Sequence, residues 1–314
     1  MRLRALAARA LTLAALALAS TMARAADTEW WVLAAQLDSG DRVLVEFTLT
    51  NLGPGERNAA AIGRWLAQDG GAAEFSRAKL DGDWTPSADG RRIDLGKFVF
   101  DRTRPGAQLR VEKASLRIAL DFPLAAAPLA TRKLAGGKWT QELWAASAPV
   151  EATLWKKGLS APIRSAGRVG LSRRLIQGSE SKLAQRRLEL FTLGAQPVYA
   201  LELAHGARAE RWVVALSPSG GVIAQDAPLV EPRGALSAPS PLALAGPAVS
   251  GSVSGGTRLA AYDPLADVPA LIRMALGLRL QSQWLAAPFA LERRSGETRA
   301  PLSGTAIASY TFYK

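Results

Sequence analysis

Residues 29–50 read EWWVLAAQLDSGDRVLVEFTLT, and this stretch decides the fold. An apolar segment at 30–37 is followed by Asp-Ser-Gly-Asp, which is typical of a tight turn, and by a second strand at 42–50. Polar and apolar residues alternate along the second strand, so we expect a buried face with Val45 and Phe47 and a wet face with Glu46 and Thr48. A hairpin that opens on two adjacent tryptophans indicates a β-barrel or sandwich with an aromatic interior.

Strand patterns of this kind recur to the end of the chain. They lie at 74–80, 91–100, 109–112, 116–122, 139–144, 151–155, 164–172, 187–193, 198–204, 210–216, 221–224, 279–285, 289–293 and 305–313. The sequence therefore predicts an all-β protein made of two antiparallel β-barrels or sandwiches in tandem, with a boundary near Ala161-Pro162. The two domains would span residues 26–160 and 161–314.

Three segments depart from the strand pattern. Residues 60–67, which include Trp65, predict a short helical turn. Residues 228–256 are rich in Pro, Gly, Ser and Ala and predict a long loop or lid. Residues 267–276 predict one short helix in the C-terminal half, with Asp267 as its N-cap and Pro269 in its first turn.

The N-terminus has the features of a secretory leader. Arg2 and Arg4 precede a short apolar run at 11–19, and Ala23-Arg24-Ala25 is an A-x-A cleavage site. The apolar run is about half the length of a membrane-spanning helix. We expect residues 1–25 to be a cleaved signal peptide and the mature protein to be periplasmic or secreted.

The charge of the chain does not indicate nucleic acid as a partner. Four arginines of the leader account for four of the twelve net positive charges, which leaves about +8 on the mature chain. The remaining basic residues are spread along strands rather than clustered. A peripheral contact with an anionic membrane surface is one interpretation of this charge, and a solvated basic surface is the other.

The composition also limits the chemistry. The chain has no cysteine and one histidine, so it can form neither a disulfide nor a classical zinc site. His205 stands beside Gly206 in an expected turn, which favours a surface position. No nucleotide-binding loop or dinucleotide fingerprint is present, and we expect no cofactor and no metal.

Two motifs resemble those of the AttH and hydroxyneurosporene-synthase-like family. One is Glu29-Trp30-Trp31 with the strand-turn-strand after it, and the other is residues 165–187, SAGRVGLSRRLIQGSESKLAQRR. The family's second-domain signature is G-Y-x-E-H-S-R followed by an apolar and basic stretch. The resemblance implies two tandem lipocalin-like barrels and a function in handling apolar small molecules or lipids, in some members as hydratases or cyclases and in others beside transporter permeases.

The sequence differs from the family's signature at the positions where a catalyst would need its acid and its histidine. If Gly167 aligns with the motif glycine, the tyrosine falls at Arg168, the acid at Gly170 and the histidine at Leu171. Neither Gly nor Leu can transfer a proton, so we expect no catalytic residue at these positions. Asp94, Asp121 and Glu202 could substitute, but their strand positions favour solvent-facing residues.

Aromatic residues supply the candidate ligand site. The chain has nine tryptophans, and rings of this kind either fill a barrel or line a cavity for an apolar ligand. Trp30 and Trp31 must point to opposite faces of their strand, so at most one can line the barrel interior. The predicted ligand-binding residues are Glu29, Trp30, Trp31, Phe47, Trp65, Trp84, Arg173 and Trp212.

Arg173 admits two interpretations. It is either a guanidinium at the barrel mouth that binds a carboxylate or phosphate headgroup, or one of several arginines on a wet edge with Arg164, Arg168 and Arg174. Lys182, Arg186 and Arg187 would extend that basic face toward a membrane surface.

Three functions remain open from the sequence. The first is an exported protein that binds or carries a hydrophobic small molecule or lipid, linked to an envelope ABC-type transport system. The second is a hydratase or cyclase acting on an isoprenoid-like substrate, which would need a buried acid. The third is an accessory subunit that contacts a transporter permease, with an exposed apolar patch near 271–278.

Overall fold

The computed structural model describes residues 28–51, 57–84, 87, 90–103, 105–217, 221–226, 229–230, 242–247, 249–254, 256–262, 280–295 and 298–313. The leader at 1–25, the helix expected at 267–276 and the apolar patch expected near 271–278 lie outside these residues. None of the helices in the described part of the chain is long and apolar enough to cross a membrane.

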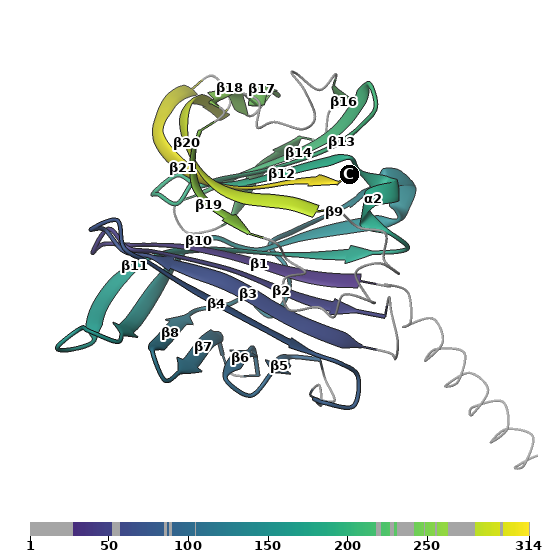
Figure 1. The fold of residues 1–314 in the computed structure, drawn as a ribbon. Coiled ribbons are helices and arrows are strands. Elements are labelled where there is room, and N and C mark those ends of the chain that lie inside the picture. Colours follow the sequence, from purple (N-terminus) through teal and green to yellow (C-terminus); the bar gives the residue numbers. More distant parts are fainter. Residues whose placement is uncertain are drawn as a thin grey trace, which may run out of the picture.

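The described chain folds into two curled antiparallel sheets, which form two lipocalin-like barrels in tandem (Figure 1). The first sheet has the order β4-β3-β2-β1-β11-β10-β8-β7-β6-β5, with β9 paired to β10. Its strands are β1 (Thr28–Leu37), β2 (Arg42–Thr50), β3 (Asn58–Leu66), β4 (Ala72–Lys79), β5 (Arg92–Asp94), β6 (Phe98–Asp101), β7 (Ala107–Lys113), β8 (Leu116–Phe122), β9 (Ala130–Leu134), β10 (Trp139–Lys156) and β11 (Ile163–Ile176). A short 3-10 turn, η1 (Ala135–Gly137), separates β9 from β10.

The second sheet has the order β15-β14-β13-β12-β21-β20-β18-β17, with β16 paired to β14 and β19 paired to β20. Its strands are β12 (Arg186–Phe191), β13 (Val198–His205), β14 (Arg208–Leu216), β15 (Val222–Asp226), β16 (Leu229–Val230), β17 (Leu242–Ala245), β18 (Val249–Val253), β19 (Thr257–Tyr262), β20 (Leu280–Ser295) and β21 (Thr298–Tyr313). The short helix α2 (Glu180–Leu183) connects the two sheets.

The opening hairpin forms as predicted. β1 and β2 pair from Thr28↔Thr50 to Gln36↔Arg42, around a turn that contains Gly40 with φ 86°. The other edge of β1 pairs with β11, where Trp31 lies opposite Arg173. The first sheet therefore extends to Ile176, and the chain passes to the second sheet between Ile176 and Arg186. A domain division at residue 160 stays a prediction.

Two predictions of local structure are wrong. Residues 60–67 lie mostly in β3, because this strand pairs with β2 on one side and β4 on the other. The segment 228–256 is not one long loop, since its described residues include β16, β17 and β18. His205 is exposed at the end of β13, beside the turn at 206–207, as predicted.

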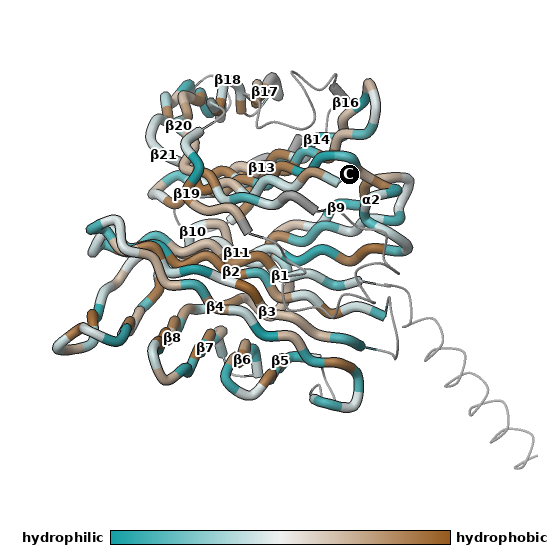
Figure 2. Tube along the Cα trace, in the orientation of Figure 1, coloured by the Kyte–Doolittle hydropathy of each residue, from teal (hydrophilic) through white to brown (hydrophobic). Residues whose placement is uncertain are grey.

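Buried residues form three layers. One cluster fills the first barrel, with Trp31, Phe47, Phe98 and Leu171 among its members. A second cluster lies between the barrels and joins Trp30 and Val32 of β1 to side chains of the second sheet such as Trp212. A third cluster, which includes Leu190 and Leu285, fills the second barrel. Figure 2 shows the hydrophobic stretches along β10, β11 and β13, where the two sheets face each other.

The tryptophan pair confirms the alternation argument. Trp31 points into the first barrel and Trp30 points out of it, into the layer between the barrels. The same alternation places both faces of β1 and β2 inside the molecule, because the second barrel covers the face that the sequence predicts to be wet. Glu46 and Thr48 are accordingly buried rather than solvated.

Candidate functional site

Strand register gathers four of the predicted residues at one end of the first barrel. Trp31 lies opposite Phe47 on β2 and opposite Arg173 on β11. Glu29 lies two residues before Trp31 on the same face of β1, and Glu142 of β10 lies opposite Arg173. Phe100, Arg102 and Trp144 also contact Trp31. We call the whole group the Trp31 cluster; its members are Glu29, Trp31, Phe47, Phe100, Arg102, Glu142, Trp144 and Arg173.

Aromatic rings form the floor of the Trp31 cluster. The Trp31 ring centroid is 5.6 Å from that of Phe100 and 5.6 Å from that of Trp144. Phe47 stacks on Phe100 at 5.3 Å. Trp31, Phe47 and Phe100 are buried, whereas Trp144 is partly exposed.

Charged groups form the rim. Arg173 Nε donates a hydrogen bond of 3.0 Å to Glu29 Oε1, and Arg173 Nη1 lies 3.4 Å from Glu142 Oε2. The two indole groups donate to the same carboxylates, Trp31 Nε1 to Glu29 at 2.6 Å and Trp144 Nε1 to Glu142 at 2.8 Å. The side chains of Glu29, Glu142 and Arg173 keep 13–24% of their surface exposed, so solvent reaches this end of the barrel.

Two guanidinium groups lie against the Trp31 ring. Arg102 Cζ is 3.9 Å from the ring centroid and Arg173 Cζ is 5.2 Å from it. Such contacts are cation–π interactions. Arg102 Nη2 also donates to the carbonyl oxygen of Gly90 at 2.7 Å. Aromatic rings beside two carboxylates and two guanidinium groups can contact an apolar group and also orient a polar end.

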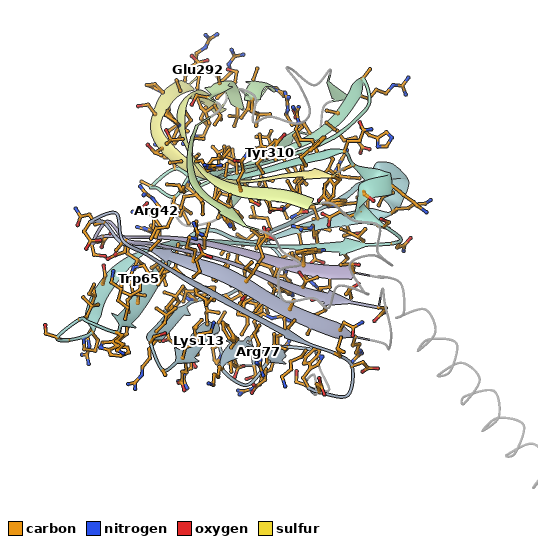
Figure 3. All side chains as sticks on the ribbon, viewed as in Figure 1. Arg42, Trp65, Arg77, Lys113, Glu292 and Tyr310 are labelled. Carbon is orange, nitrogen blue, oxygen red and sulfur yellow. The ribbon has the colours of Figure 1, made fainter. Side chains whose placement is uncertain are left out.

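The other four predicted residues lie elsewhere. Trp65 lies toward the opposite end of the first barrel, where it is buried and its Nε1 donates to Asp41 at 3.0 Å (Figure 3). Trp84 is partly exposed and donates to Arg57 O at 2.8 Å. Trp30 and Trp212 belong to the layer between the barrels. The structure thus joins Glu29, Trp31, Phe47 and Arg173 but does not bring all eight residues to one place.

An open hollow of about 440 Å³ lies on the same barrel. Its lining combines the carboxylates Asp101, Asp121 and Glu151 with Pro105, Pro123 and Pro149. Burial opposes ionisation of Asp101, but hydrogen bonds from the hydroxyl and backbone NH of Thr103 and from Arg92 outweigh it and lower the pKa of Asp101. The lining thus places three carboxylates beside apolar residues such as Phe122 and Val150.

Glutamate and arginine side chains form a second cluster, which the sequence does not reveal. They lie between the barrels and are at most 7% exposed. We call them the interbarrel network: Glu46, Arg174, Glu180, Arg187 and Glu189, with Gln141, Ser172, Tyr199, Ser309, Thr311 and Tyr313 as hydrogen-bonding neighbours.

Arg187 and Glu189 are the centre of this network. Arg187 Nη1 donates to Glu189 at 2.8 Å, and Arg187 Nη2 reaches Glu46 at 3.4 Å and Thr311 at 2.8 Å. Burial disfavours the charge on Arg187, but the nearby carboxylates, Glu46 foremost, raise its pKa well above the ordinary value. Glu189 also accepts hydrogen bonds from Tyr199 at 2.8 Å and from Ser172. Glu46 belongs to the first barrel and Arg187 to the second, so these contacts tie the barrels together.

The network continues in one further ion pair, with aromatic rings beside it. Arg174 Nε lies 3.1 Å from Glu180 Oε1, and its guanidinium lies 4.4 Å from the Trp30 ring centroid. Tyr313 donates to Glu180. Burial first, and then the neighbouring carboxylate, raises the pKa of Tyr199 beside Glu189 and that of Tyr313 beside Glu180 well above the ordinary value.

These positions correct two expectations about charge. Arg174, Arg186 and Arg187 are buried in ion pairs, so they do not belong to an exposed basic face with Lys182. Glu202 is 2% exposed rather than solvent-facing. The sequence shows polar residues at alternate strand positions, and it does not show that a second sheet covers that face.

Gly170, where the alignment considered above would place an acid, leaves no room for a side chain. A Cβ built on Gly170 would lie 2.3 Å from Cδ1 of Phe191, a buried ring of the second sheet. Any side chain at this position would collide with the second barrel. Leu171, where the same alignment would place a histidine, is buried in the core of the first barrel.

Comparisons with known proteins support the fold. No family model matches the chain, and no curated protein matches its sequence. Among solved structures, a protein described as AttH from Nitrosomonas europaea matches with a TM-score of 0.54 at 13% identity, over 92% of this chain and 93% of the other. CghA matches with a TM-score of 0.53 at 11% identity, over 91% and 88% of the two chains. CghA with Sch210972 matches with a TM-score of 0.50 at 11% identity, over 92% and 89%.

Proposed function

We propose that this protein binds an apolar small molecule or a lipid at the Trp31 cluster and does not transform it. The observation that carries this proposal is the aromatic floor of Trp31, Phe47 and Phe100 below a charged, partly exposed rim. Aromatic rings supply apolar contact, and the Arg173 guanidinium can take an acidic or polar end of the ligand.

The fold is consistent with this function. Lipocalin-like barrels bind ligands at their mouths, and the solved structures with this fold include an AttH protein and CghA with Sch210972. We propose that the chain is a divergent relative of the AttH and hydroxyneurosporene-synthase-like proteins that uses its first barrel for binding.

Two measurements test the proposal. Native mass spectrometry of the purified protein, followed by solvent extraction, should detect a bound apolar molecule. Phenylnaphthylamine, an uncharged apolar probe, should bind the wild type and bind the Trp31→Leu variant about tenfold more weakly. Trp155→Leu is the matched control, because Trp155 lies near the far end of β10 against Arg117. Equal probe affinity in both variants would contradict the site.

A hydratase or cyclase for an isoprenoid-like substrate is the second candidate function, and the buried glutamates are the observation in its favour. Such an enzyme needs a buried acid, and Glu46, Glu180, Glu189 and Glu202 are all buried. Their oxygens contact arginine, tyrosine or serine side chains, which favours a role in packing. Conversion of an acyclic isoprenoid by the wild type, together with its loss in Glu189→Gln, would establish the enzyme.

The predicted leader is the basis for a proposal about where the protein acts. We propose that the mature chain acts in the periplasm or outside the cell, with an ABC-type transporter permease or the membrane surface as its contact. N-terminal sequencing of the exported protein should begin near Ala26. Co-purification with a permease after crosslinking would identify the transport partner.

A further inference from the structure

Elements of both barrels meet at one end of the molecule. η1, which follows β9, contacts β14, where the backbone NH of Ala135 donates to the Glu210 carboxylate at 3.0 Å. The turn after β13 contacts the segment after α2, because the backbone NH of Gly206 donates to the Gln185 side chain at 3.0 Å. Figure 1 shows β9, α2 and the C-terminus at this end. Residues far apart in the sequence therefore share one surface.

This surface is basic. β9 contributes two exposed cationic side chains, and the end of η1, α2 and the start of β14 contribute one each. We call these five side chains the basic end; its members are Arg132, Lys133, Lys138, Lys182 and Arg208. None of them forms an ion pair with another residue that the structure describes. The fold thus gathers basic residues that are spread along the sequence.

Exposed carboxylates lie elsewhere on the described chain. Those that the structure describes belong to the first barrel: Asp38, Asp69, Glu74, Asp81, Asp83, Glu112, Asp121 and Glu151. The acids next to the basic end already have partners. Glu142 and Glu180 are paired with arginines, and Glu210 accepts hydrogen bonds from the backbone NH of Ala135. The basic end therefore presents a positive potential to solvent.

An anionic lipid bilayer fits this surface. Each Lys or Arg near such a bilayer adds attraction without a fixed pairing geometry. The Trp31 cluster lies at the same end of the first barrel, because Thr28 of β1 and Trp139 of β10 both pair with Ile176. A site for an apolar molecule or lipid beside a cationic surface favours a bilayer over an acidic protein, since the bilayer can supply that ligand.

We propose that the basic end docks this protein on an anionic lipid bilayer. The choice of a bilayer rests on the proposed function, and the proposal assigns the surface that meets it. Docking itself needs only the cationic side chains, so it can be measured separately from ligand binding at the Trp31 cluster.

The test measures co-sedimentation with vesicles. The exported protein is used, so that the basic leader does not contribute. It should partition about tenfold or more in favour of phosphatidylglycerol–phosphatidylcholine vesicles over phosphatidylcholine vesicles, and added salt should reduce this preference. A triple variant of the basic end should lose about tenfold or more of the partitioning to anionic vesicles; it combines Arg132→Gln, Lys133→Gln and Lys182→Gln.

The matched control removes three exposed charges from the first barrel. It combines Arg77→Gln, Arg110→Gln and Lys157→Gln, and it should lose less than about threefold of the partitioning. Both triple variants should bind phenylnaphthylamine as the wild type does, because neither changes the Trp31 cluster. A wild type that binds anionic vesicles but not phenylnaphthylamine would reject the Trp31 site and support the docking surface.

Two results with vesicles would overturn the proposal. One is equal partitioning of the wild type to anionic and neutral vesicles, and the other is an equal loss in the two triple variants. Binding to native membranes that trypsin digestion abolishes, without binding to protein-free vesicles, would also overturn it. That result would assign the basic end to an acidic membrane protein.

Discussion

Gly170 lies where the two barrels pack closely against each other. Its Cβ would meet the buried Phe191 ring at 2.3 Å, so we expect Gly170→Ala to lower the free energy of unfolding by about 1–3 kcal/mol. Urea denaturation measures this change. Gly194→Ala is the matched control, because a Cβ there has no heavy atom within 4 Å. Equal stability of the two variants would show that the interface relaxes around Gly170.

Arg187 is the buried counter-ion of Glu46 and Glu189 in the interbarrel network. Arg187→Leu leaves Glu46 and Glu189 buried without this partner, so we expect a loss of about 3–5 kcal/mol in the free energy of unfolding. Arg132→Leu removes the same charge from an exposed position on β9 and should change stability by less than about 0.5 kcal/mol. A small effect of Arg187→Leu would mean that the carboxylates are solvated in solution.

At the scale of single residues, the sequence predicts which side chains share a face of a strand better than it predicts what covers that face. Alternation correctly separates Trp30 from Trp31. It fails for Glu46 and Glu202, because a polar residue on a strand has the same pattern whether water or another sheet covers it. The match of Arg187 on β12 to Glu46 on β2 depends on how the barrels pack, and no local pattern encodes that.

The short strands β5 and β6 are joined by a charged pair. Arg92 Nη1 donates to Asp101 at 2.8 Å across the two strands. The pKa of Asp101 is lower in the folded chain than the ordinary value of about 4, so this stability is present above about pH 4 and is lost as the pH falls through the folded pKa. We therefore expect the stability difference between wild type and Asp101→Asn to shrink below about pH 4. A stability difference that does not change on acidification would contradict this expectation.

Whole elements are predicted where their pattern is local. The β1–β2 hairpin has its turn and both strands in one continuous stretch, and it forms as expected. Segment 60–67 becomes a strand because β2 and β4 bind both of its edges, which overrides its own weak preference. In the candidate site, the sequence analysis did not identify Phe100, Arg102, Glu142 and Trp144. Glu142 and Trp144 lie on β10, two strands from β1, and Phe100 of β6 and Arg102 after it approach Trp31 from farther along the curled sheet, so no local pattern joins them to Trp31.

The whole molecule should behave as one unit at high pH. Tyr199, Tyr310 and Tyr313 have raised pKa values in the folded chain, so their contribution to stability is complete below about pH 10 and is lost as the pH rises beyond it. We expect ultraviolet titration of a Tyr262→Phe variant, which lacks the fourth tyrosine of the chain, to show these phenols ionising only as both barrels unfold together. Phenolate absorbance that rises near pH 10 before any change in circular dichroism would contradict this.

The pairing of β1 with β11 also sets an order of events during synthesis. Trp31 finds Phe47 early, but its second neighbour, Arg173, leaves the ribosome only after the strands between them have been made. Contacts so distant along the chain close slowly, since loop entropy must be lost before they form. Until then the edge of β1 that pairs with β11 keeps its backbone NH and CO groups unpaired, so it is available for wrong pairing. A nascent chain of this design has to be kept apart from its neighbours until β11 arrives, and its yield should respond more to chaperone supply than to the stability of the finished fold.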